Sequence, residues 1–416
     1  MSINRCYNLD DFRREARRKL PAPLFHFMDG GADDEQSLRA NTDAFDACQL
    51  LPNTFADPSD LDISTTILGQ KIDWPVLLAP TGITRLFHHD GERAAARAAA
   101  KAGTIYCLST MSNVSIEEIG ALTSGPKCFQ IYIHRDRGLT REFVERSKAA
   151  GFDALCLTVD TLVAGNRERD LNSGMTIPPK LTLKSLASFA THWQWAFNYL
   201  TSEKFELANL TGNRSNQDRA GSDALISVID YVNSQFDPSI TWADAAELVQ
   251  QWQGPFVLKG IMTAQDAKRA VDIGATAIMV SNHGGRQLDG VPSAFECLAD
   301  IADAVGGRAE IILDGGIRRG SHVLKAIAMG ADACSIGRGY LYPLAAGGEA
   351  GVTRALHRLR DEIERDMILM GCDRLDKLDR SKLRPAGVRF KSGAGCDTME
   401  GPSVAPSTIA LVTESR

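Results

Sequence analysis

The chain has 416 residues, of which 44% are apolar, and this is enough to bury one large core or two smaller ones. Its formal net charge of −6 and the lack of any basic stretch argue against a nucleic-acid binder. A charged N-terminus and the lack of any long uncharged apolar run predict neither a secretory signal nor a transmembrane helix. The nine cysteines are nowhere spaced C-x-x-C. They are typical of reduced thiols in a cytoplasmic small-molecule enzyme, and we expect no metal site.

Eight short apolar runs predict strands. The first four are WPVLLAP (74–80), TIYCLST (104–110), CFQIYI (128–133) and ALCLTVD (154–160). The second half adds PFVLKG (255–260), AIMVSNH (277–283), EIILDGG (310–316) and ACSIGR (333–338). Amphipathic segments that favour helices separate these runs, and several of them close on a glycine. Strands that are apolar on both faces and alternate with helices predict a parallel sheet, and eight such units predict an α/β fold of the (β/α)8 TIM barrel type. A doubly wound open sheet is the alternative.

The spacing of the runs indicates how the chain is divided. The gap after the fourth strand is several times longer than the others, so we expect an insertion at about residues 165–240 of a barrel that spans 74–383. It begins at the C-terminal end of a strand, where such barrels carry their active sites, and is interpreted as a lid or as a docking element for a membrane or partner. Residues 1–73 would form a helical segment that packs on the barrel. Residues 384–416 are rich in Gly, Pro and Ser, which predicts a disordered tail.

Polar residues follow almost every predicted strand, and in a barrel these positions converge on one mouth. They are Thr81 and Gly82, Ser109, Gln130 and Tyr132, Thr158 and Asp160, Lys259, His283 and Arg286, Asp314 and Arg318, and Gly337 and Arg338. The turns LDGGIRRG and SIGRG combine glycine with arginine after the last two strands, where barrels often bind a phosphate. A phosphate-bearing cofactor or substrate is therefore predicted, although such glycines also occur where they only close a tight turn.

Nearly the whole chain resembles the family of FMN-dependent (S)-2-hydroxy acid dehydrogenases and oxidases. The motifs that carry the resemblance, in family order, are LFHFMDGGADDE, APTG, LST, FQIY, LTVDT, GNRERD, LKG, SNHGGRQLDG, LDGGIRRG and IGR. The segments FHFMDGGA, RDRGL, THWQWAF and FDPSI are most similar to the quinone-linked bacterial L-lactate dehydrogenases. The resemblance implies a noncovalent FMN, an (S)-2-hydroxy acid oxidised to the 2-oxo acid, and a homotetramer. It lapses beyond residue 384.

The resemblance also implies a role for each catalytic residue. His283 would be the base that takes a proton from the substrate, and Asp160 would orient its imidazole. Arg286 and Arg167 would bind the substrate carboxylate through their planar guanidinium groups, and Tyr132 would donate its hydroxyl to the substrate. For Arg167, a solvated lid residue paired with a neighbouring carboxylate is the alternative.

The resemblance assigns the remaining polar strand ends to the FMN site. Lys259 would place its ammonium near flavin N1 and O2, where negative charge accumulates on reduction. The other expected FMN-binding residues are Ala79, Pro80, Thr81, Gly82, Ser109, Gln130, Thr158, Ser281, Asp314, Gly315, Gly316, Arg318, Gly337 and Arg338. Hydroxyl and amide groups among them would meet the polar edge of the ring, and Arg318, Arg338 and the glycine-rich backbone would hold the phosphate.

Two departures from the family pattern leave the substrate and the acceptor open. Phe27 stands where the family usually has a tyrosine just before the GGA motif, so a hydroxyl expected at the substrate carboxylate is missing. The substrate would be L-lactate or a larger, more apolar analogue. Gly82 stands where glycolate oxidases have alanine, so the electron acceptor is a quinone, O2 with release of peroxide, or another oxidant.

Apolar residues in the insertion predict one apolar helical face. Leu186, Phe189, Trp193, Phe197 and Leu200 follow one another at spacings typical of a helix. Most such faces pack on their own protein. The alternative is a peripheral contact with the inner face of the cytoplasmic membrane, because interfacial helices favour Trp, Phe and Leu.

Two alternatives outside the family's chemistry stay open. One is another FMN barrel, such as an isomerase of a phosphorylated substrate, which would not need His283, Arg286 and Arg167 together. The other is a catalytically inactive flavoprotein, which would hold a yellow cofactor that no 2-hydroxy acid bleaches.

Overall fold

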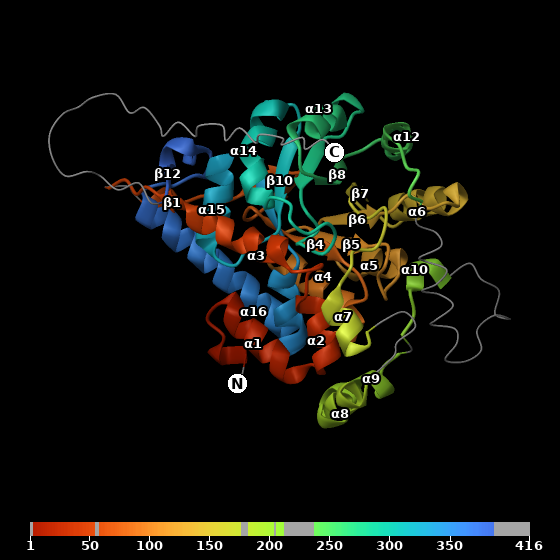
Figure 1. Cartoon of the computed structure of the whole chain (residues 1–416). Coiled ribbons are helices and arrows are strands. Elements are labelled where there is room, and N and C mark those ends of the chain that lie inside the picture. The colour runs from red at the N-terminus through yellow and green to blue at the C-terminus, as the bar shows by residue number, and fades with distance from the viewer. Residues whose placement is uncertain (1–2, 55–57, 176–181, 204, 212–236, 387–416) are drawn as a thin grey trace, which may run out of the picture. The chain divides into compact units, whose positions relative to one another are not determined.

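Eight parallel strands close into a barrel in the computed structural model of the chain (Figure 1). They are β4 (Val76–Thr81), β5 (Tyr106–Ser109), β6 (Lys127–Ile131), β7 (Ala154–Thr158), β8 (Phe256–Ile261), β9 (Ala277–Val280), β10 (Glu310–Asp314) and β11 (Ala333–Ile336). Each pairs with its neighbour in sequence, and β11 closes the barrel by pairing with β4. The structure describes residues 3–54, 58–175, 182–203, 205–211 and 237–386. The (β/α)8 barrel is confirmed, and every predicted run overlaps its strand.

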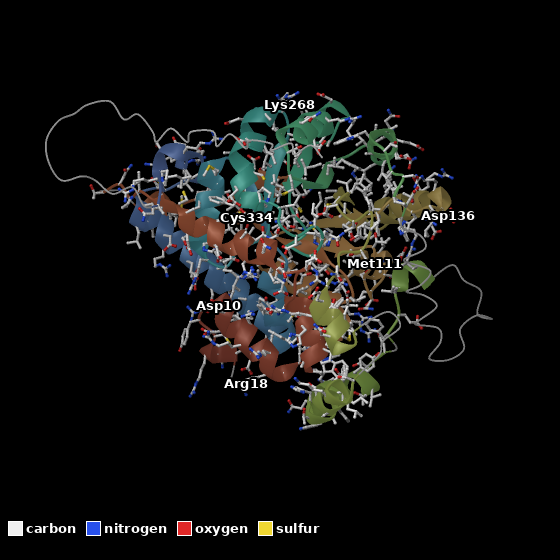
Figure 2. The ribbon with its side chains drawn as sticks, viewed as in Figure 1. Asp10, Arg18, Met111, Asp136, Lys268 and Cys334 are labelled. Atoms are coloured by element: carbon white, nitrogen blue, oxygen red, sulfur yellow. The ribbon has the colours of Figure 1, made fainter. Side chains whose placement is uncertain are left out.

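The barrel strands are apolar on both faces because one face packs outward on helices and the other fills the interior. A separate cluster of buried residues comprises Leu77, Cys107, Cys128, Ala154, Cys156, Val257, Ala277, Met279, Ile312 and Ala333, from all eight strands. Side chains alternate along a strand, so these are the inward positions near its beginning. Figure 2 shows the contrast between interior and rim: Cys334 lies within the molecule, whereas Lys268 and Asp136 lie at its periphery.

Helices cover the outside of the barrel. They are α4 (Gly91–Lys101), α5 (Ile116–Leu122), α6 (Arg137–Ala149), α12 (Trp242–Trp252), α13 (Ala264–Asp272), α14 (Ala294–Val305), α15 (Gly320–Met329) and α16 (Arg338–Met370), one after each strand. Sequence signals fix several of their ends. Ser293 and Glu296 form a reciprocal capping box at the start of α14, and Gly306 ends that helix in the left-handed conformation.

The N-terminal segment contains α1 (Leu9–Lys19), α2 (Ala22–Asp29), α3 (Gln36–Asp43) and a hairpin of β2 (Thr65–Ile67) and β3 (Gln70–Ile72). The hairpin closes the beginning of the barrel, since its Ile67, Leu68 and Ile72 belong to the interior cluster. Its two-residue loop has positive φ at both Leu68 (53°) and Gly69 (71°), as a tight hairpin requires. The predicted helical segment thus also contains strands, which the sequence did not reveal because strands of three residues are too short to show alternation.

Asp29, at the end of α2, fixes the N-terminal segment against the barrel. Its carboxylate accepts hydrogen bonds from Arg13 (2.6 Å), Arg169 (3.0 Å) and Tyr342 (2.8 Å). Burial alone would raise the pKa of Asp29, but these partners hold it well below its usual range, so the side chain stays ionised. Three segments far apart in sequence are thereby tied to the turn that follows α2.

The insertion after β7 contains α7 (Glu168–Ser173), α8 (Leu183–Thr191), α9 (Trp193–Thr201) and α10 (Ala208–Thr211). The predicted single apolar face is wrong, because the chain leaves the helical conformation at His192 (φ −103°, ψ 53°) and divides the stripe between α8 and α9. Leu186, Trp193, Phe197 and Leu200 are all at least half exposed in this chain. Among the described residues, no helix is long and apolar enough to cross a membrane.

The C-terminal boundary was placed slightly too early. A strand, β12 (Leu383–Pro385), pairs antiparallel with β1 (Cys48–Leu50), and the Ala386 amide donates to the carbonyl of Ala47 at 2.8 Å. Backbone pairing therefore continues past residue 384. The rest of the predicted tail, 387–416, and the Asn/Ser-rich part of the insertion, 212–236, lie outside the described residues.

Candidate active site

The polar residues of the mouth occupy the next inward positions of the strands. Two residues beyond the apolar interior layer come Ala79, Ser109, Gln130, Thr158, Lys259, Ser281, Asp314 and Ser335. Because side chains alternate along a strand, this spacing turns each of them toward the barrel axis. The interior thus changes from an apolar layer to a mostly polar one within a single step, at the end of the barrel where catalytic residues are expected.

A cavity of about 540 Å³ lies above this polar layer, a size typical of cofactor and substrate sites. The predicted site residues that line it are Phe27, Ala79, Pro80, Thr81, Gly82, Ser109, Tyr132, Arg167, Lys259, His283, Arg286, Asp314, Gly315, Gly316, Arg318, Gly337 and Arg338. Four others, Gln130, Thr158, Asp160 and Ser281, do not line it. They lie beside it, and Gln130, Asp160 and Ser281 hydrogen-bond residues that do.

His283 stands in a strained turn. Its φ is +57°, in the left-handed region that side chains other than Gly, Asn and Asp seldom adopt, and Gly284 and Gly285 continue with +64° and +71°. A Cβ on Gly285 would lie 2.5 Å from the backbone nitrogen of Leu38, so glycine is required there by packing as well. The glycines therefore allow the chain to turn tightly after β9 and present the imidazole to the cavity.

Asp160 holds the imidazole of His283. The Nδ1 atom of His283 lies 2.9 Å from Oδ1 of Asp160. Burial would raise the pKa of Asp160, but the charges of His283 and Lys259 outweigh it and lower that pKa. An ionised carboxylate accepts a hydrogen bond from Nδ1–H of a neutral imidazole, which leaves the Nε2 lone pair free to accept a proton.

A buried network fixes Lys259 as a cation. Its Nζ donates to Ser281 (2.8 Å) and forms an ion pair with Asp314 (2.9 Å), while the Ser281 hydroxyl donates to Asp314 at 2.8 Å. Burial would lower the pKa of Lys259, but Asp314 and Asp160 raise it above its ordinary value. The ammonium therefore stays charged at the cavity floor. Ser281 also accepts a hydrogen bond from the backbone amide of His283 (3.0 Å), which connects the network to the turn after β9.

Phe27 is enclosed by two arginines. The guanidinium carbons of Arg167 and Arg286 lie 5.1 and 5.4 Å from the centroid of its ring. Arg286 donates to the carbonyls of Phe27 (2.8 Å) and Gly30 (2.9 Å), and Arg167 donates to Asp170 (2.7 Å). Burial and the charges of Arg167 and Arg338 lower the pKa of Arg286, so this end of the cavity favours an anion.

A second group of residues at the cavity has the chemistry of a phosphate site. Gly315 (φ +122°) and Gly316 (φ +74°) follow β10, and a Cβ on Gly316 would lie 1.7 Å from the carbonyl oxygen of Asn41. Arg318 and Arg338 line the same cavity. Arg338 also donates to the Gly30 carbonyl, at 2.6 Å, and burial lowers its pKa. Two guanidiniums beside exposed backbone amides suit a phosphate.

The unpaired polar atoms of the site fit FMN. Gln130 Nε2, Thr158 Oγ1 and Ser335 Oγ are buried and have no hydrogen-bond partner among the described residues. Such atoms cost free energy unless a ligand pairs with them. They form part of the inward polar layer, where the nitrogen and oxygen edge of an isoalloxazine would supply partners. The residues present therefore fit both the ring and the phosphate of FMN.

Sequence reasoning missed two parts of the site. Ser335 lines the cavity and follows Ala333 at the inward spacing of two, so the register of the ACSIGR run contained that signal. The insertion contributes an aromatic wall of Phe189, Trp195 and Tyr199, which also lines the cavity. No spacing in the sequence predicts that α8 and α9 fold back over the mouth.

Comparisons with known proteins agree with this site. The family model of FMN-dependent dehydrogenases matches residues 16–385. An L-lactate dehydrogenase of Pectobacterium atrosepticum is 42% identical over 362 residues, which are 87% of this chain and 92% of that protein. The glycolate oxidase of Spinacia oleracea is 39% identical over 376 residues, 90% of this chain and 95% of that protein.

Solved structures give the same result. The monotopic membrane protein (S)-mandelate dehydrogenase superposes with a TM-score of 0.87 and 33% identity, covering 92% of this chain and all of that one. A mandelate oxidase with (S)-2-phenylpropionate has a TM-score of 0.76 and 36% identity, covering 91% and 98%. The chain therefore belongs to the FMN-dependent dehydrogenase family and is an FMN-dependent enzyme that oxidises 2-hydroxy acids.

Proposed function

We propose that the enzyme oxidises an (S)-2-hydroxy acid whose side chain is larger and more apolar than the methyl group of lactate, and that the electrons pass to a quinone at a membrane. One observation carries the catalytic part of this proposal. His283, which is hydrogen-bonded to Asp160, shares a cavity with two arginines that lie over the ring of Phe27. A base and an anion site in one cavity are what a 2-hydroxy acid needs.

His283 acts as the base in this proposal. Its Nε2 takes a proton from the α-hydroxyl or the α-carbon of the substrate, and Asp160 stabilises the imidazolium that forms. When bound, FMN supplies the acceptor of the two electrons that leave the α-carbon. Lys259 holds a positive charge at the floor of the cavity, which stabilises negative charge that develops there.

The two arginines orient the substrate. Arg286 forms no ion pair with any described residue, so its charge is available for a carboxylate, whereas Arg167 shares its charge with Asp170. Planar guanidiniums bind a carboxylate at two points and thereby fix the α-carbon. Burial and the charge of Asp160 raise the pKa of Tyr132 to about 12, so its hydroxyl stays protonated and donates to the substrate.

The wall from the insertion supports a larger apolar side chain. Phe27, Phe189, Trp195, Tyr199 and Phe205 all line the cavity. Burying apolar surface favours binding by roughly 25 cal/mol per Å², so a methyl group would use little of this wall. An anaerobic panel of (S)-2-hydroxy acids of increasing size tests the point. Loss of flavin absorbance is expected to be fastest with branched or aromatic acids, and a clear preference for lactate would contradict the proposal.

Phe27→Tyr should shift the substrate preference toward small acids. The added hydroxyl can hydrogen-bond the carboxylate of lactate or glycolate, and one such bond is worth about 0.5–1.5 kcal/mol, up to roughly tenfold in affinity. Larger acids that use the apolar ring would leave that hydroxyl unpaired, at a cost of about 1–3 kcal/mol. The measurement is the ratio of kcat/KM for lactate to that for a larger acid. Phe27→Leu is the control, since it removes the ring without adding a hydroxyl, and an unchanged ratio in Phe27→Tyr would show that residue 27 does not face the substrate.

Association with a membrane surface is supported by the exposed apolar residues of α8 and α9. Leu183, Trp193, Phe197 and Leu200 are 86%, 67%, 60% and 80% exposed. Exposed Trp, Phe and Leu on neighbouring short helices are typical of interfacial segments. A similar solved structure is that of a monotopic membrane protein. The homotetramer stays a prediction of the family resemblance.

Replacing Trp193, Phe197 and Leu200 together by serine should reduce sedimentation with lipid vesicles while flavin reduction by a soluble acid continues. Phe189 is left intact because it packs against Trp195 and lines the cavity. The control replaces exposed apolar residues elsewhere, Ile368 and Leu369 of α16. Equal vesicle binding by both variants would refute the membrane contact.

A further inference from the structure

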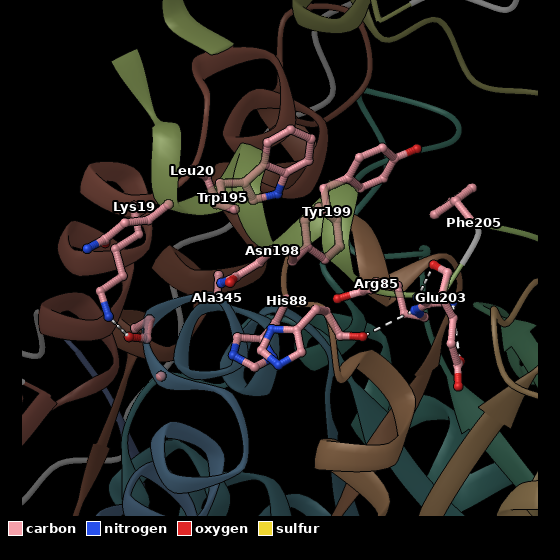
Figure 3. A pocket seen from close by; sticks show the side chains of 16 residues that line it. Lys19, Leu20, Arg85, His88, Trp195, Asn198, Tyr199, Glu203, Phe205 and Ala345 are labelled. Carbon is pink, nitrogen blue, oxygen red and sulfur yellow. Dashed lines mark hydrogen bonds and ion pairs between the residues drawn. The ribbon is translucent and has the colours of Figure 1, made fainter. Parts of the chain in front are cut away.

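A second cavity lies behind the aromatic wall of the insertion (Figure 3). Its volume is about 140 Å³. Trp195 and Tyr199 line both this cavity and the cavity of about 540 Å³ described above, which is called the flavin cavity from here on. One wall therefore separates the two cavities. The other sides come from α1, from the loop after β4 with His88, and from Ala345 of α16. The second cavity is thus next to the redox site without being part of it.

The shared wall is held in place by contacts outside the cavity. The rings of Trp195 and Tyr199 are stacked, with centroids 5.1 Å apart and planes inclined by 16°. The indole nitrogen of Trp195 donates to the carbonyl of Leu86 at 2.9 Å, and Phe189 packs on the indole from α8 at 5.3 Å. A fixed pair of aromatic side chains offers a platform for a planar ring.

The cations at this cavity donate to oxygens of the protein. Arg85 donates to the carbonyls of His89 and Glu203, and its guanidinium lies 3.9 Å from the Glu203 carboxylate. The Lys19 ammonium donates to the carbonyl of Ala346, as the dashed line in Figure 3 shows. Both cations are thus engaged by oxygens of the protein, and the rest of the lining offers aromatic and amide groups that suit a neutral ligand.

Hydrogen-bond donors are nevertheless present. Burial and the neighbouring His89 lower the pKa of His88 to about 4, so its imidazole is neutral at physiological pH. Nδ1 of His88 accepts from the Asp90 amide at 3.3 Å, which places the ring proton on Nε2. The side-chain amide of Asn198 also lines the cavity. A ligand with carbonyl oxygens on a planar ring matches this combination.

We propose that the second cavity binds the ring of the quinone that accepts the electrons. A cavity of about 150 Å³ accommodates one six-membered ring, so a volume of this order suits the ring of a quinone without its tail. The apolar tail would lie along the exposed residues of α8 and α9.

The 2-hydroxy acid loses two electrons and two protons in becoming the 2-oxo acid. The quinone gains the same number, and its two carbonyls become hydroxyls. The inference rests on the proposed function, since it assumes that reduced flavin passes electrons to a quinone.

Filling the cavity tests the inference. Asn198 is exposed on α9 and lines the second cavity but not the flavin cavity, so Asn198→Phe should block the ring without disturbing the fold or the substrate. The matched control is Thr201→Phe on the same helix, which lines neither cavity. Each holoenzyme is reduced anaerobically with a 2-hydroxy acid and then mixed with a short-chain benzoquinone. Quenching of tryptophan fluorescence by the quinone is titrated separately, as a binding readout that needs no turnover.

We expect Asn198→Phe to be bleached by the acid at the wild-type rate but reoxidised by the quinone at least tenfold more slowly, with saturable quenching lost. Thr201→Phe should behave as wild type in both assays. Equal reoxidation of the two variants would overturn the inference and place quinone entry in the flavin cavity. Loss of binding to anionic vesicles in Asn198→Phe with normal quinone kinetics would overturn it in favour of a lipid headgroup. Failure of the acid to bleach any variant would refute the proposed function instead, and the fluorescence titration would still decide whether the cavity binds a quinone.

Discussion

His283→Asn is expected to keep the flavin and to lower the rate of its reduction by substrate by ~10²–10⁴-fold, the usual contribution of a positioned base. Asparagine is chosen because it tolerates the left-handed conformation that residue 283 adopts (φ +57°), so the turn after β9 should stay intact. The measurement is the rate of loss of flavin absorbance after anaerobic mixing with the acid.

Asp160→Asn tests the role of Asp160 in orienting His283 while the base itself remains in place. The amide would no longer favour the tautomer with the proton on Nδ1 of His283, so reduction should slow although the imidazole remains. Flavin content and melting temperature are measured on both variants. Reduction at nearly the wild-type rate in His283→Asn, with flavin bound, would show that another group removes the proton.

Arg286→Lys should weaken substrate binding by about tenfold or more and also destabilise the fold. A point-like ammonium cannot reproduce the two-pronged contact with a carboxylate, and hydrogen bonds to charged groups are worth about 1.5–3 kcal/mol each. Arg286 also donates hydrogen bonds to the carbonyls of Phe27 and Gly30. The variant loses these bonds, which hold the turn after α2. The measurements are the dependence of the flavin reduction rate on substrate concentration and the melting temperature.

Arg338→Lys is the matched control for the loss of the hydrogen bond to the Gly30 carbonyl. Arg338 also donates to the Gly30 carbonyl, but its expected ligand is the phosphate of FMN and not the substrate carboxylate. The control should lower FMN retention and stability, and after reconstitution with FMN its substrate affinity should be normal. If Arg286→Lys lost stability but kept its substrate affinity, the carboxylate-binding role of Arg286 would be wrong.

The barrel and much of the site could be predicted from the sequence because strand periodicity determines both. A strand buried on both faces appears as an unbroken apolar run, and a polar residue that ends it on the inward side is then expected to line a site. Lys259 and Asp314 were found in this way. Ser335 obeys the same rule and was missed, because a serine inside an apolar run carries no chemical signal of its own.

Contacts between distant segments could not be predicted from local patterns. Asp29 takes partners from α1, from the insertion and from α16, and no spacing in the sequence joins them. The break at His192 was missed as well, since the apolar spacing continues across it although the backbone leaves the helix. The aromatic wall over the mouth and the second cavity behind it likewise became visible only in the folded chain.

Anaerobic mixing of the purified enzyme with the two enantiomers of one apolar 2-hydroxy acid tests the central claim most directly. If Arg167 and Arg286 hold the carboxylate, as proposed, only one enantiomer can turn its hydroxyl to His283, and the proposed function assigns this to the (S)-acid. The (S)-acid should therefore bleach the flavin completely within the dead time or in a single fast phase, and the (R)-acid should leave it oxidised. Bleaching by both enantiomers at similar rates, or by neither, would contradict the assignment of this site.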